Sequence, residues 1–327
     1  MIGCIGVGID IGGTTIKAAR VGIDGAMSQP SRRKTPTHRR DDIIALIVDM
    51  IEEQVEEVEA GFDIVVGVGT PGYGSEDGYI IGGAHNLPGW YDFNLVHELS
   101  RKLPYPVFIN NDASMATFGE YAKYYAESVQ NMAYLGFGTG VGGGIVIHGK
   151  LYSGARGLGT ELGHIVVDPD GMPCACGRRG CLQTWASRKG LATAAREMIT
   201  REDSRTQFAR DFLAAGRDLE PEEIFVYVEQ GDPLARELFA AMCDSIARAC
   251  DTITAILAPE VIVLGGGIMN AGSFILDSVR ERFARYCMPD FLPHVSLEAA
   301  RCGENSGIIG AGLYAISRSS EERLRPH

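Results

Sequence analysis

The stretch GCIGVGIDIGGTTIKAARVGI, residues 3 to 23, decides the fold class. β-Branched residues flank its Gly-Gly pair on both sides, which predicts two strands joined by a tight turn. Asp10 stands at the end of the first of these strands, directly before the turn. Because glycine lets backbone N–H groups approach a phosphate closely, Asp10 could orient hydrated Mg²⁺ while Thr14 and Thr15 contact phosphate oxygens. The alternative is a plain hairpin turn with a hydrogen-bonded aspartate.

Alternating strand and helix patterns follow this unit. Apolar residues at helical spacing predict a helix over residues 41–60, and buried strands are expected at 63–72 and 106–112. The sequence after Asp112 turns helical again. Such alternation predicts an α/β fold with a largely parallel sheet covered on both faces. The basic stretch RRKTPTHRR, residues 32–40, is rich in turn residues and is expected to be a solvated loop.

The opening pattern recurs later in the chain. NMAYLGFGTGVGGGIVIHGKLY, residues 131–152, again has the order strand, glycine-rich turn, strand, and VIVLGGGIM, residues 261–269, is a buried strand that runs into glycines. This predicts two α/β lobes with a cleft between them. The small lobe comprises residues 1–112, completed by the C-terminal helix at 306–327, and the large lobe comprises residues 113–305. Further helices are expected at 185–200, 204–215, 221–229 and 233–257.

Composition and charge argue against several classes of function. The 327 residues carry a formal net charge of -12, which argues against a nucleic-acid partner, because such proteins carry a basic surface. No apolar run approaches the roughly 18 residues that a membrane span needs. The amino terminus lacks the features of a signal peptide, so we expect a cytoplasmic protein without a membrane partner.

The second glycine-rich turn, GFGTGVGGG at residues 136–144, contains the spacing G-x-G-x-x-G from Gly138 to Gly143. A dinucleotide-binding turn of that kind opens a helix, whereas this one precedes the strand-like IVIHGKLY, so the dinucleotide interpretation fails. The sequence G-x-x-x-x-G-K-[ST] does not occur in the chain. A P-loop is therefore excluded as the phosphate-binding element.

The stretch INNDAS, residues 109–114, places amides and a carboxylate at the carboxyl end of a predicted strand. Ligands of α/β proteins bind in crevices outside such strand ends. Asp112 could accept a hydroxyl proton there, and the amide of Asn110 could orient another hydroxyl. The alternative is that Asp112 is the N-cap of the following helix.

A cluster of metal-ligating residues follows in GTELGHIVVDPDG and CACGRRGC. Glu161 and His164 stand three positions apart, and alone they could equally be surface residues. With His164, however, the cysteines of the pattern C-x-C-x4-C form the four-ligand set that structural Zn²⁺ requires, as a knuckle over residues 164–181. The three are Cys174, Cys176 and Cys181. Redox C-x-x-C spacing is missing, an iron-sulfur cluster would need a fourth thiolate, and a loop with free thiols is the remaining alternative.

The order of these motifs along the chain is more specific than any one of them. DIGGTT, GVGTPG, NLPGW, NND, GFGTGVGGG, ELGH, CACGRRGCLQTWAS and VLGGG follow one another over nearly the whole chain. In this order they resemble the ROK family of sugar kinases, and most of all its bacterial glucokinases. The resemblance implies the actin-like ATPase fold, which is ribonuclease H-like, with two α/β lobes that close on ATP and a hexose.

The resemblance also implies roles for individual residues. Asp112 would be the general base for the sugar's 6-hydroxyl, and Asp10 would serve Mg²⁺ and ATP. The implied sugar contacts are Gly83, Asn86, Asn110, Asp112, Glu161, His164 and Gln183. The implied nucleotide contacts are Asp10, Gly12, Gly13, Thr14, Thr15, Gly138, Thr139, Gly140, Gly265 and Gly266. The family also suggests a homo-oligomer, either a dimer or a tetramer.

One residue departs from the family pattern. Family kinases usually carry glutamate after GCL, where it reaches the anomeric end of the sugar, and here that position is Gln183. Glutamine adds an amide donor and removes a charge, so the preferred sugar can differ from glucose. Mannose, fructose, allose or an N-acetylhexosamine such as N-acetylmannosamine is the alternative substrate. A non-catalytic sugar sensor is a further alternative, and a repressor is disfavoured because the first strand begins at about residue 3.

Overall fold

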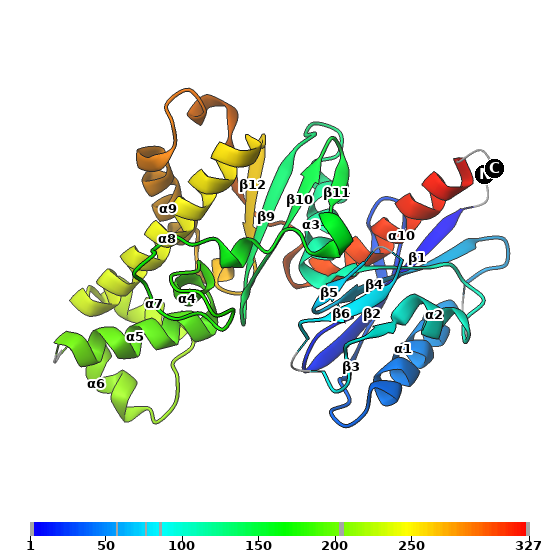
Figure 1. Ribbon diagram of the computed structural model, residues 1–327, viewed down its shortest axis with the longest axis horizontal. Helices are drawn as coiled ribbons and strands as arrows, with labels where there is room; N and C mark the ends of the chain where they lie inside the picture. Colours follow the sequence, from blue (N-terminus) through cyan, green and yellow to red (C-terminus); the bar gives the residue numbers. More distant parts are fainter. Residues whose placement is uncertain (1–2, 57, 76, 85–86, 203–205, 325–327) are drawn as a thin grey trace. The chain divides into compact units, whose positions relative to one another are not determined.

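The hairpin predicted from residues 3 to 23 begins the fold. The structure is a computed structural model that describes residues 3–56, 58–75, 77–84, 87–202 and 206–324 (Figure 1). Strands β1 (Cys4–Ile11) and β2 (Thr15–Val21) pair antiparallel, with Asp10 opposite Lys17. The Gly12 N–H donates to the Thr15 carbonyl at 2.9 Å and closes the turn. The predicted strand, turn and strand are confirmed.

This hairpin is part of a five-stranded sheet with the order β3-β2-β1-β4-β8. Its other strands are β3 (Met27–Lys34), β4 (Asp63–Thr70) and β8 (Val107–Asn111). β1, β4 and β8 run parallel, whereas β2 pairs antiparallel with both β1 and β3. The sheet is therefore mixed, and the expectation of a largely parallel sheet holds only for its β1-β4-β8 half.

Strand β3 corrects the first part of the predicted basic loop, residues 32–34, whereas residues 35–39 lie outside any helix or strand. Arg32, Arg33 and Lys34 belong to this edge strand, whose side chains are mostly exposed. Arg33 forms an ion pair with Glu53 at 2.6 Å. Charged side chains protect an exposed edge from pairing with other strands, so an edge strand lacks the apolar alternation by which strands are recognised. The sequence pattern could not reveal β3 for this reason.

Helices cover both faces of the sheet. They are α1 (Arg40–Val55), α2 (Leu95–Ser100), α3 (Asp112–Tyr124) and α10 (Ser306–Leu324). Val66 and Val68 join the core that buries α1, while Val65 and Gly67 on the same strand face α10. α10 packs along α3 and across β1 and β4 (Figure 1). Because strand side chains alternate between faces, β4 supplies both cores.

The packing of α10 is unusually close. A Cβ added to Gly67 would lie 1.8 Å from the Ala311 carbonyl oxygen, and one added to Gly310 would lie 1.7 Å from the Met115 carbonyl oxygen. No side chain fits at such distances, because real contacts between carbon and oxygen exceed about 3 Å. Glycine at these positions therefore sets the separation between α10, β4 and α3.

A second five-stranded sheet has the order β11-β10-β9-β12-β13. Counted in sequence, this is the same strand order as in the first sheet, in agreement with the recurrence seen in the sequence. Its strands are β9 (Met132–Phe137), β10 (Val141–Ile147), β11 (Lys150–Tyr152), β12 (Val261–Gly265) and β13 (Ser296–Ala299). A small three-stranded sheet contains β5 (Tyr73–Gly74), β6 (Tyr79–Gly82) and β7 (Phe93–Asn94).

The remaining helices lie between β11 and β13 in sequence. They are α4 (Gln183–Ala186), α5 (Arg188–Glu202), α6 (Gln207–Ala214), α7 (Pro221–Gln230), α8 (Pro233–Leu257) and α9 (Ser273–Tyr286). Short 3-10 turns occupy Ala155–Gly157, Leu162–His164, Met269–Ala271, Leu292–His294 and Gly303–Asn305. The helix predicted at 185–200 is interrupted, since the extended backbone of Ser187 separates α4 from α5. α9 and β13 were not predicted.

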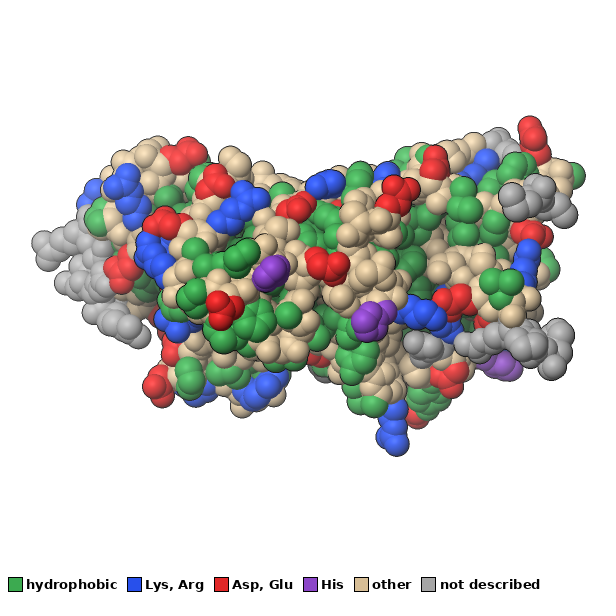
Figure 2. All heavy atoms as spheres, turned by 90° about the horizontal axis from the view of Figure 1, so that it is seen from above, with side chains coloured by type: hydrophobic (Ala, Val, Ile, Leu, Met, Phe, Trp, Pro, Cys, Tyr) green, Lys and Arg blue, Asp and Glu red, His purple; other side chains and the backbone are tan. Residues whose placement is uncertain are grey.

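The chain folds as two compact units. Unit 1 contains Met1–Gln130, Gly144–Thr160 and Arg301–His327, and unit 2 contains Asn131–Gly143 and Glu161–Ala300. The lobe limits predicted from the sequence stay a prediction about domains. Among the described residues, no helix has both the length and the apolar character to cross a membrane. Acidic and basic side chains alternate over the face seen in Figure 2, and no broad basic patch is visible there.

Candidate functional site

In unit 1, the parallel strands bring the candidate residues to one edge of the sheet. Asp10 pairs with Gly69 of β4, and Gly69 in turn pairs with Asn110 of β8. Neighbouring strands lie about 4.8 Å apart, so the backbones of Asp10 and Asn110 are separated by roughly 10 Å. Asp112 follows two residues after Asn110, at the first position of α3. The two candidate carboxylates therefore belong to the same sheet edge.

Asn111 caps α3, so the N-cap alternative for Asp112 is wrong. The Asn111 side chain accepts hydrogen bonds from the N–H groups of Ala113 at 2.9 Å and Ser114 at 3.2 Å. Asp112 Oδ1 also accepts from the Ala113 N–H, at 2.8 Å. The helix dipole stabilises a carboxylate in the first turn, and the anionic form of such a group could accept a proton.

The side-chain amides of Asn110 and Asn111 form hydrogen bonds with other residues of unit 1. Asn110 is buried, and its Nδ2 donates to Ser153 Oγ at 3.2 Å. Asn111 Nδ2 donates to the Gly72 carbonyl at 3.1 Å, and Gly72 lies against Gly83. From the sequence alone, Asp112 and not Asn111 is the candidate cap, because helix-start patterns do not resolve a difference of one residue. Asn86, another predicted sugar contact, lies outside the described residues.

Asp10 is a carboxylate held close to the start of α10. A Cβ on Gly307 would lie only 3.0 Å from Asp10 Cγ, so glycine lets the helix approach the carboxyl group. Burial raises the pKa of Asp10, and the opposing Lys17 partly counteracts this rise. A carboxylate whose charge is costly to bury gains from a bound cation. One such carboxylate, together with phosphate oxygens, is a usual Mg²⁺ site.

Thr35 forms two hydrogen bonds with the turn that follows Asp10. Its N–H donates to the Thr14 carbonyl at 2.9 Å, and its Oγ1 donates to the Gly12 carbonyl at 2.7 Å. Thr35 is almost fully buried. The carbonyls of Gly12 and Thr14 therefore both accept hydrogen bonds from Thr35. Thr35 had no recognisable sequence signal, because it follows an edge strand and contacts the turn only through the tertiary fold.

Two glycine turns lie side by side in unit 2, at residues 138–140 and 265–266. Gly136 pairs with Gly265 on the parallel neighbour β12. Gly266 has φ of +88°, and a Cβ there would lie 2.4 Å from the Phe137 carbonyl oxygen. In the turn of residues 138–140, the Gly138 N–H donates to the Gly140 carbonyl at 2.9 Å. Only glycine allows this conformation and this approach at position 266, so the two turns are built to lie in contact.

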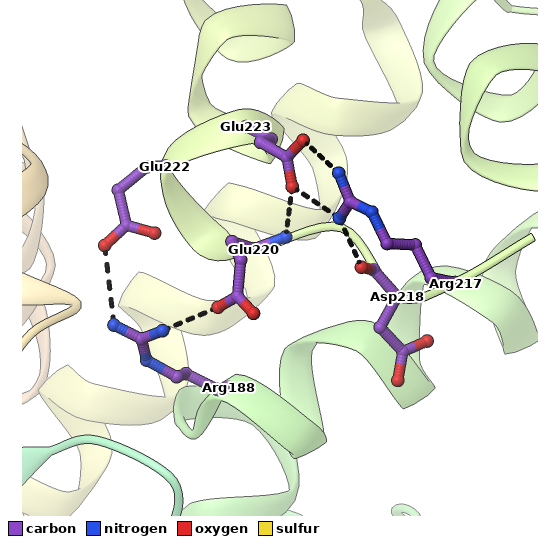
Figure 3. A network of polar contacts seen from close by, with 6 residues as sticks. All are labelled: Arg188, Arg217, Asp218, Glu220, Glu222 and Glu223. Atoms are coloured by element: carbon purple, nitrogen blue, oxygen red, sulfur yellow. Dashed lines mark hydrogen bonds and ion pairs between the residues drawn. The ribbon is translucent and has the colours of Figure 1, made fainter. Parts of the chain in front are cut away.

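A charged network joins the start of α5 to the start of α7 (Figure 3). The Arg188 guanidinium contacts Glu220 at 2.6 Å and Glu222 at 3.7 Å. Its backbone N–H donates to the Gly138 carbonyl at 2.9 Å, and a Cβ on Gly267 would lie 3.0 Å from Arg188 Nη2. Arg188 therefore connects both glycine turns to the start of α7. Sequence reasoning did not single it out.

The structure brings His164, Cys174, Cys176 and Cys181 together within unit 2. Their ligand atoms all lie within 4.8 Å of one another. Cys174 Sγ lies 3.6 Å from His164 Nδ1, and Cys176 Sγ lies 3.6 Å from Cys181 Sγ. A Zn–S bond of about 2.3 Å places two sulfurs of a tetrahedral site about 3.8 Å apart. The donor set and its spacing therefore fit a tetrahedral Zn²⁺.

The thiols of the cluster differ in how readily they ionise: burial raises the pKa of Cys181 to about 12, whereas the pKa of Cys176 is lowered. Burial opposes ionisation of Cys176, but hydrogen bonds from the backbone and side chain of Arg178 outweigh it and lower the pKa to about 6. Metal binds the thiolate form, so a cysteine ionised at neutral pH is prepared as a ligand. None of the eight cysteines forms a disulfide.

The loop that carries His164 packs against the start of β10. Glu161 is exposed and directly precedes the turn Leu162–His164. A Cβ on Gly163 would lie 2.0 Å from the Val141 carbonyl oxygen, so the glycine between Glu161 and His164 is required for this contact. The metal ligand and the predicted sugar contact thus share one short segment of fixed geometry.

These features belong to a sugar kinase of the actin-like ATPase fold. A sequence model described as "ROK family" matches residues 6–318, and the chain belongs to this family. A curated glucokinase of Thermotoga maritima is 34% identical over 315 residues, which cover 95% of this chain and 97% of that protein. An N-acetylmannosamine kinase of Salmonella typhi is 32% identical over 308 residues, with coverage of 94% and 97%.

Solved structures confirm the fold. A ROK family glucokinase from Streptomyces griseus, crystallised in complex with glucose and AMPPNP, matches with a TM-score of 0.79 and 28% identity. The match covers 96% of this chain and 99% of that one. The predicted family and the predicted actin-like fold are therefore confirmed.

Proposed function

We propose that this protein transfers the γ-phosphoryl group of ATP to the 6-hydroxyl of a hexose, and that the preferred hexose is glucose. The observation that carries the proposal is the shared sheet edge of Asp10 and Asp112 in a chain that belongs to the ROK family. One carboxylate is placed for a metal–nucleotide complex and the other for a hydroxyl proton. The names of the glucokinase relatives support glucose as the acceptor.

The proposed reaction depends mainly on the positioning of the reacting groups and on stabilisation of the charge on the phosphoryl oxygens. Asp112 accepts the proton of the 6-hydroxyl while the sugar oxygen forms its bond to the γ-phosphorus. The bond from that phosphorus to the β–γ bridging oxygen breaks, and ADP leaves. Backbone N–H groups of the glycine turns stabilise the charge that develops on the phosphoryl oxygens. These turns comprise Gly12, Gly13, Thr14 and Thr15 in unit 1, and Gly138, Thr139, Gly140, Gly265 and Gly266 in unit 2.

Two metal ions complete the proposal. Asp10 would hold Mg²⁺ through its hydration shell, and the ion would neutralise charge on the β- and γ-phosphates. His164, Cys174, Cys176 and Cys181 would hold a structural Zn²⁺.

The proposed sugar contacts are Gly83, Asn86, Asn110, Asp112, Glu161, His164 and Gln183, as predicted from the sequence. We also propose a cytoplasmic homo-oligomer, which light scattering on the purified protein would test.

A second acceptor is supported by a specific observation. Relatives named N-acetylmannosamine kinase match over nearly the same length as the glucokinases. Gln183 offers a donor where the family has a carboxylate, so the pattern of sugar groups that this position selects can differ from that of the family. A kinase for an N-acetylhexosamine or for another hexose is therefore the second candidate. A sugar sensor without turnover is the third.

A coupled assay of ADP release distinguishes these candidates. We expect turnover with glucose above that with mannose, fructose, allose, N-acetylglucosamine or N-acetylmannosamine, ranked by kcat/KM. A difference of one well-formed hydrogen bond is worth about 1 kcal/mol, so neighbouring sugars should differ by several-fold at least. A higher kcat/KM with an N-acetylated sugar would establish the second candidate. Sugar binding by calorimetry with no ADP release from any sugar would establish the sensor.

Loss of one metal ligand should remove both metal and stability. We expect Cys176→Ser to abolish stoichiometric zinc and to lower the yield of folded protein, because zinc binding contributes directly to folding. Elemental analysis and thermal unfolding measure the two effects. Cys243→Ser is the control, since Cys243 is a buried helix residue outside the cluster. Unchanged zinc content in Cys176→Ser would contradict the four-ligand assignment.

A further inference from the structure

Glu120 is a buried carboxylate that the proposed mechanism does not use. It belongs to α3, about two helical turns after Asp112, and it is fully buried. An ionised carboxyl group loses its hydration when it is buried, so it needs hydrogen-bond donors within the protein. The groups that donate to Glu120 therefore indicate what this residue does.

Two backbone N–H groups donate to the Glu120 carboxylate. The Arg301 nitrogen lies 3.1 Å from Oε1 and 3.0 Å from Oε2, and the Cys302 nitrogen lies 2.8 Å from Oε1. Hydrogen bonds to a charged acceptor are stronger than those between neutral groups. The Arg301 guanidinium also lies over the rings of Tyr124 and Tyr125, 5.6 Å and 5.1 Å from their centroids. α3 therefore holds Arg301 through its backbone as well as its side chain.

Arg301 is the point where the chain enters the last part of unit 1. Ala300 is the last residue of unit 2, and Arg301 begins the final part of unit 1. We call residues 301–305, which join β13 to α10, the entry segment. Residues 301 and 302 lie outside any helix or strand, so no strand or helix partner accepts from their N–H groups. The carboxylate of Glu120 takes that place.

The far end of the entry segment is bonded to the β1–β2 hairpin. Lys17 Nζ donates to the Glu304 carbonyl at 3.0 Å. Lys17 belongs to β2 and pairs with Asp10 across the hairpin. Asp112 is the first residue of α3, the helix that carries Glu120. The entry segment therefore connects the two elements that carry the proposed site carboxylates.

We propose that Glu120 is a positioning residue, which fixes the entry segment to α3 and so keeps Asp112 and Asp10 in the relative position that phosphoryl transfer needs. Glu120 acts through this segment and not on a reacting atom. The inference rests on the proposed function. Without the carboxylate, the N–H groups of Arg301 and Cys302 lose their acceptor, and the segment can move relative to α3. A misplacement of about 1 Å at a reacting group can lower the rate by about 10²-fold.

Hydrogen exchange in the wild-type protein tests the contact between Glu120 and the entry segment. A buried, hydrogen-bonded N–H is protected from exchange, whereas exposed turns exchange quickly. We expect residues 301 and 302 to exchange at least about 10-fold more slowly than the exposed residues 216–218, measured by mass spectrometry on overlapping peptides. Equal rates in the two segments would overturn the inference. This measurement does not depend on the folding of any variant.

Two variants of the full-length protein test the effect on turnover. Glu120→Gln keeps the size of the side chain but replaces one acceptor oxygen by an NH₂ group, which cannot accept from an N–H. Thr117→Val is the matched control, because Thr117 is also fully buried in α3 and its hydroxyl donates to the Ala113 carbonyl at 2.7 Å, within the helix. Both changes disturb a buried hydrogen bond of α3, but only that of Glu120 involves the entry segment.

We expect Glu120→Gln to raise the exchange rate at residues 301 and 302 by about 10-fold and to lower kcat by about 10-fold or more. KM for glucose and for ATP should stay within about threefold of the wild type, because the binding groups themselves are unchanged. Thr117→Val should keep the wild-type exchange rate and kcat. Thermal unfolding shows that both variants are folded at the assay temperature.

Two results would overturn the inference. One is wild-type kcat in Glu120→Gln, and the other is an equal loss of kcat in Thr117→Val, which would show an effect of general stability. A wild-type protein that releases no ADP with any sugar would instead overturn the proposed function. The exchange rates would then still decide whether Glu120 holds the entry segment.

Discussion

Replacing Asp112 by asparagine should lower kcat by about 10²- to 10⁴-fold, the usual contribution of a positioned general base. Asparagine has the same shape and still accepts a hydrogen bond from the Ala113 N–H, so α3 should begin at the same residue. The side chain loses the ability to accept a proton. Sugar binding, measured by calorimetry, should remain detectable. The coupled ADP assay under saturating glucose and ATP measures the loss of turnover.

A matched substitution separates chemistry from helix electrostatics. Asp41 also lies in the first turn of a helix, α1, and is exposed. Both Asp112→Asn and Asp41→Asn remove a favourable charge–dipole interaction of about 0.5 kcal/mol, so both should lower the melting temperature slightly. Asp41→Asn should keep the wild-type kcat. Full activity in Asp112→Asn would show that another group accepts the proton.

Replacing Gly310 by alanine should lower the free energy of unfolding by about 3 kcal/mol or more, at the upper end for an overpacked core. The new methyl group would lie 1.7 Å from the Met115 carbonyl oxygen, and neither atom can move without shifting α3 or α10. In an unconstrained helix the same change would stabilise by about 1 kcal/mol through helix propensity. Urea unfolding followed by circular dichroism measures the difference.

The effect of Gly310→Ala should extend to the proposed active site. α10 begins beside Asp10, and α3 begins at Asp112, so a displaced contact between these helices moves both proposed site carboxylates. We expect kcat to fall even where the variant is folded. Ser320→Ala is the control, since Ser320 is an exposed residue of the same helix. Gly310→Ala with wild-type stability would mean that α10 is not packed this closely.

Much of the chemistry was predictable from short stretches of sequence. The β1–β2 hairpin and the strand before Asp112 follow from local patterns of β-branched residues and glycine. The spacing of His164 and the three cysteines was enough to predict a metal cluster, because ligand identity and loop length are local properties. The order of the motifs was enough to predict the family.

Other features depended on contacts between distant parts of the chain. β3 is a strand only because β2 pairs with it, and its charged residues carry no apolar signal. The choice of Asn111 over Asp112 as the helix cap depends on where the α3 backbone turns, and a difference of one residue lies below the resolution of helix-start patterns. Thr35 and Arg188 act on glycine turns far away in sequence.

By itself, then, the sequence determined the types of group at the candidate site and the elements that carry them. It did so because backbone conformation, capping and metal-ligand spacing depend on neighbouring residues. Only the tertiary structure decided which partner each group has: Cys174 for Gln183, the start of α10 for Asp10, and the Met115 carbonyl for Gly310. These partners are set by the packing of strands and helices at separations of a few ångströms, which no local pattern encodes.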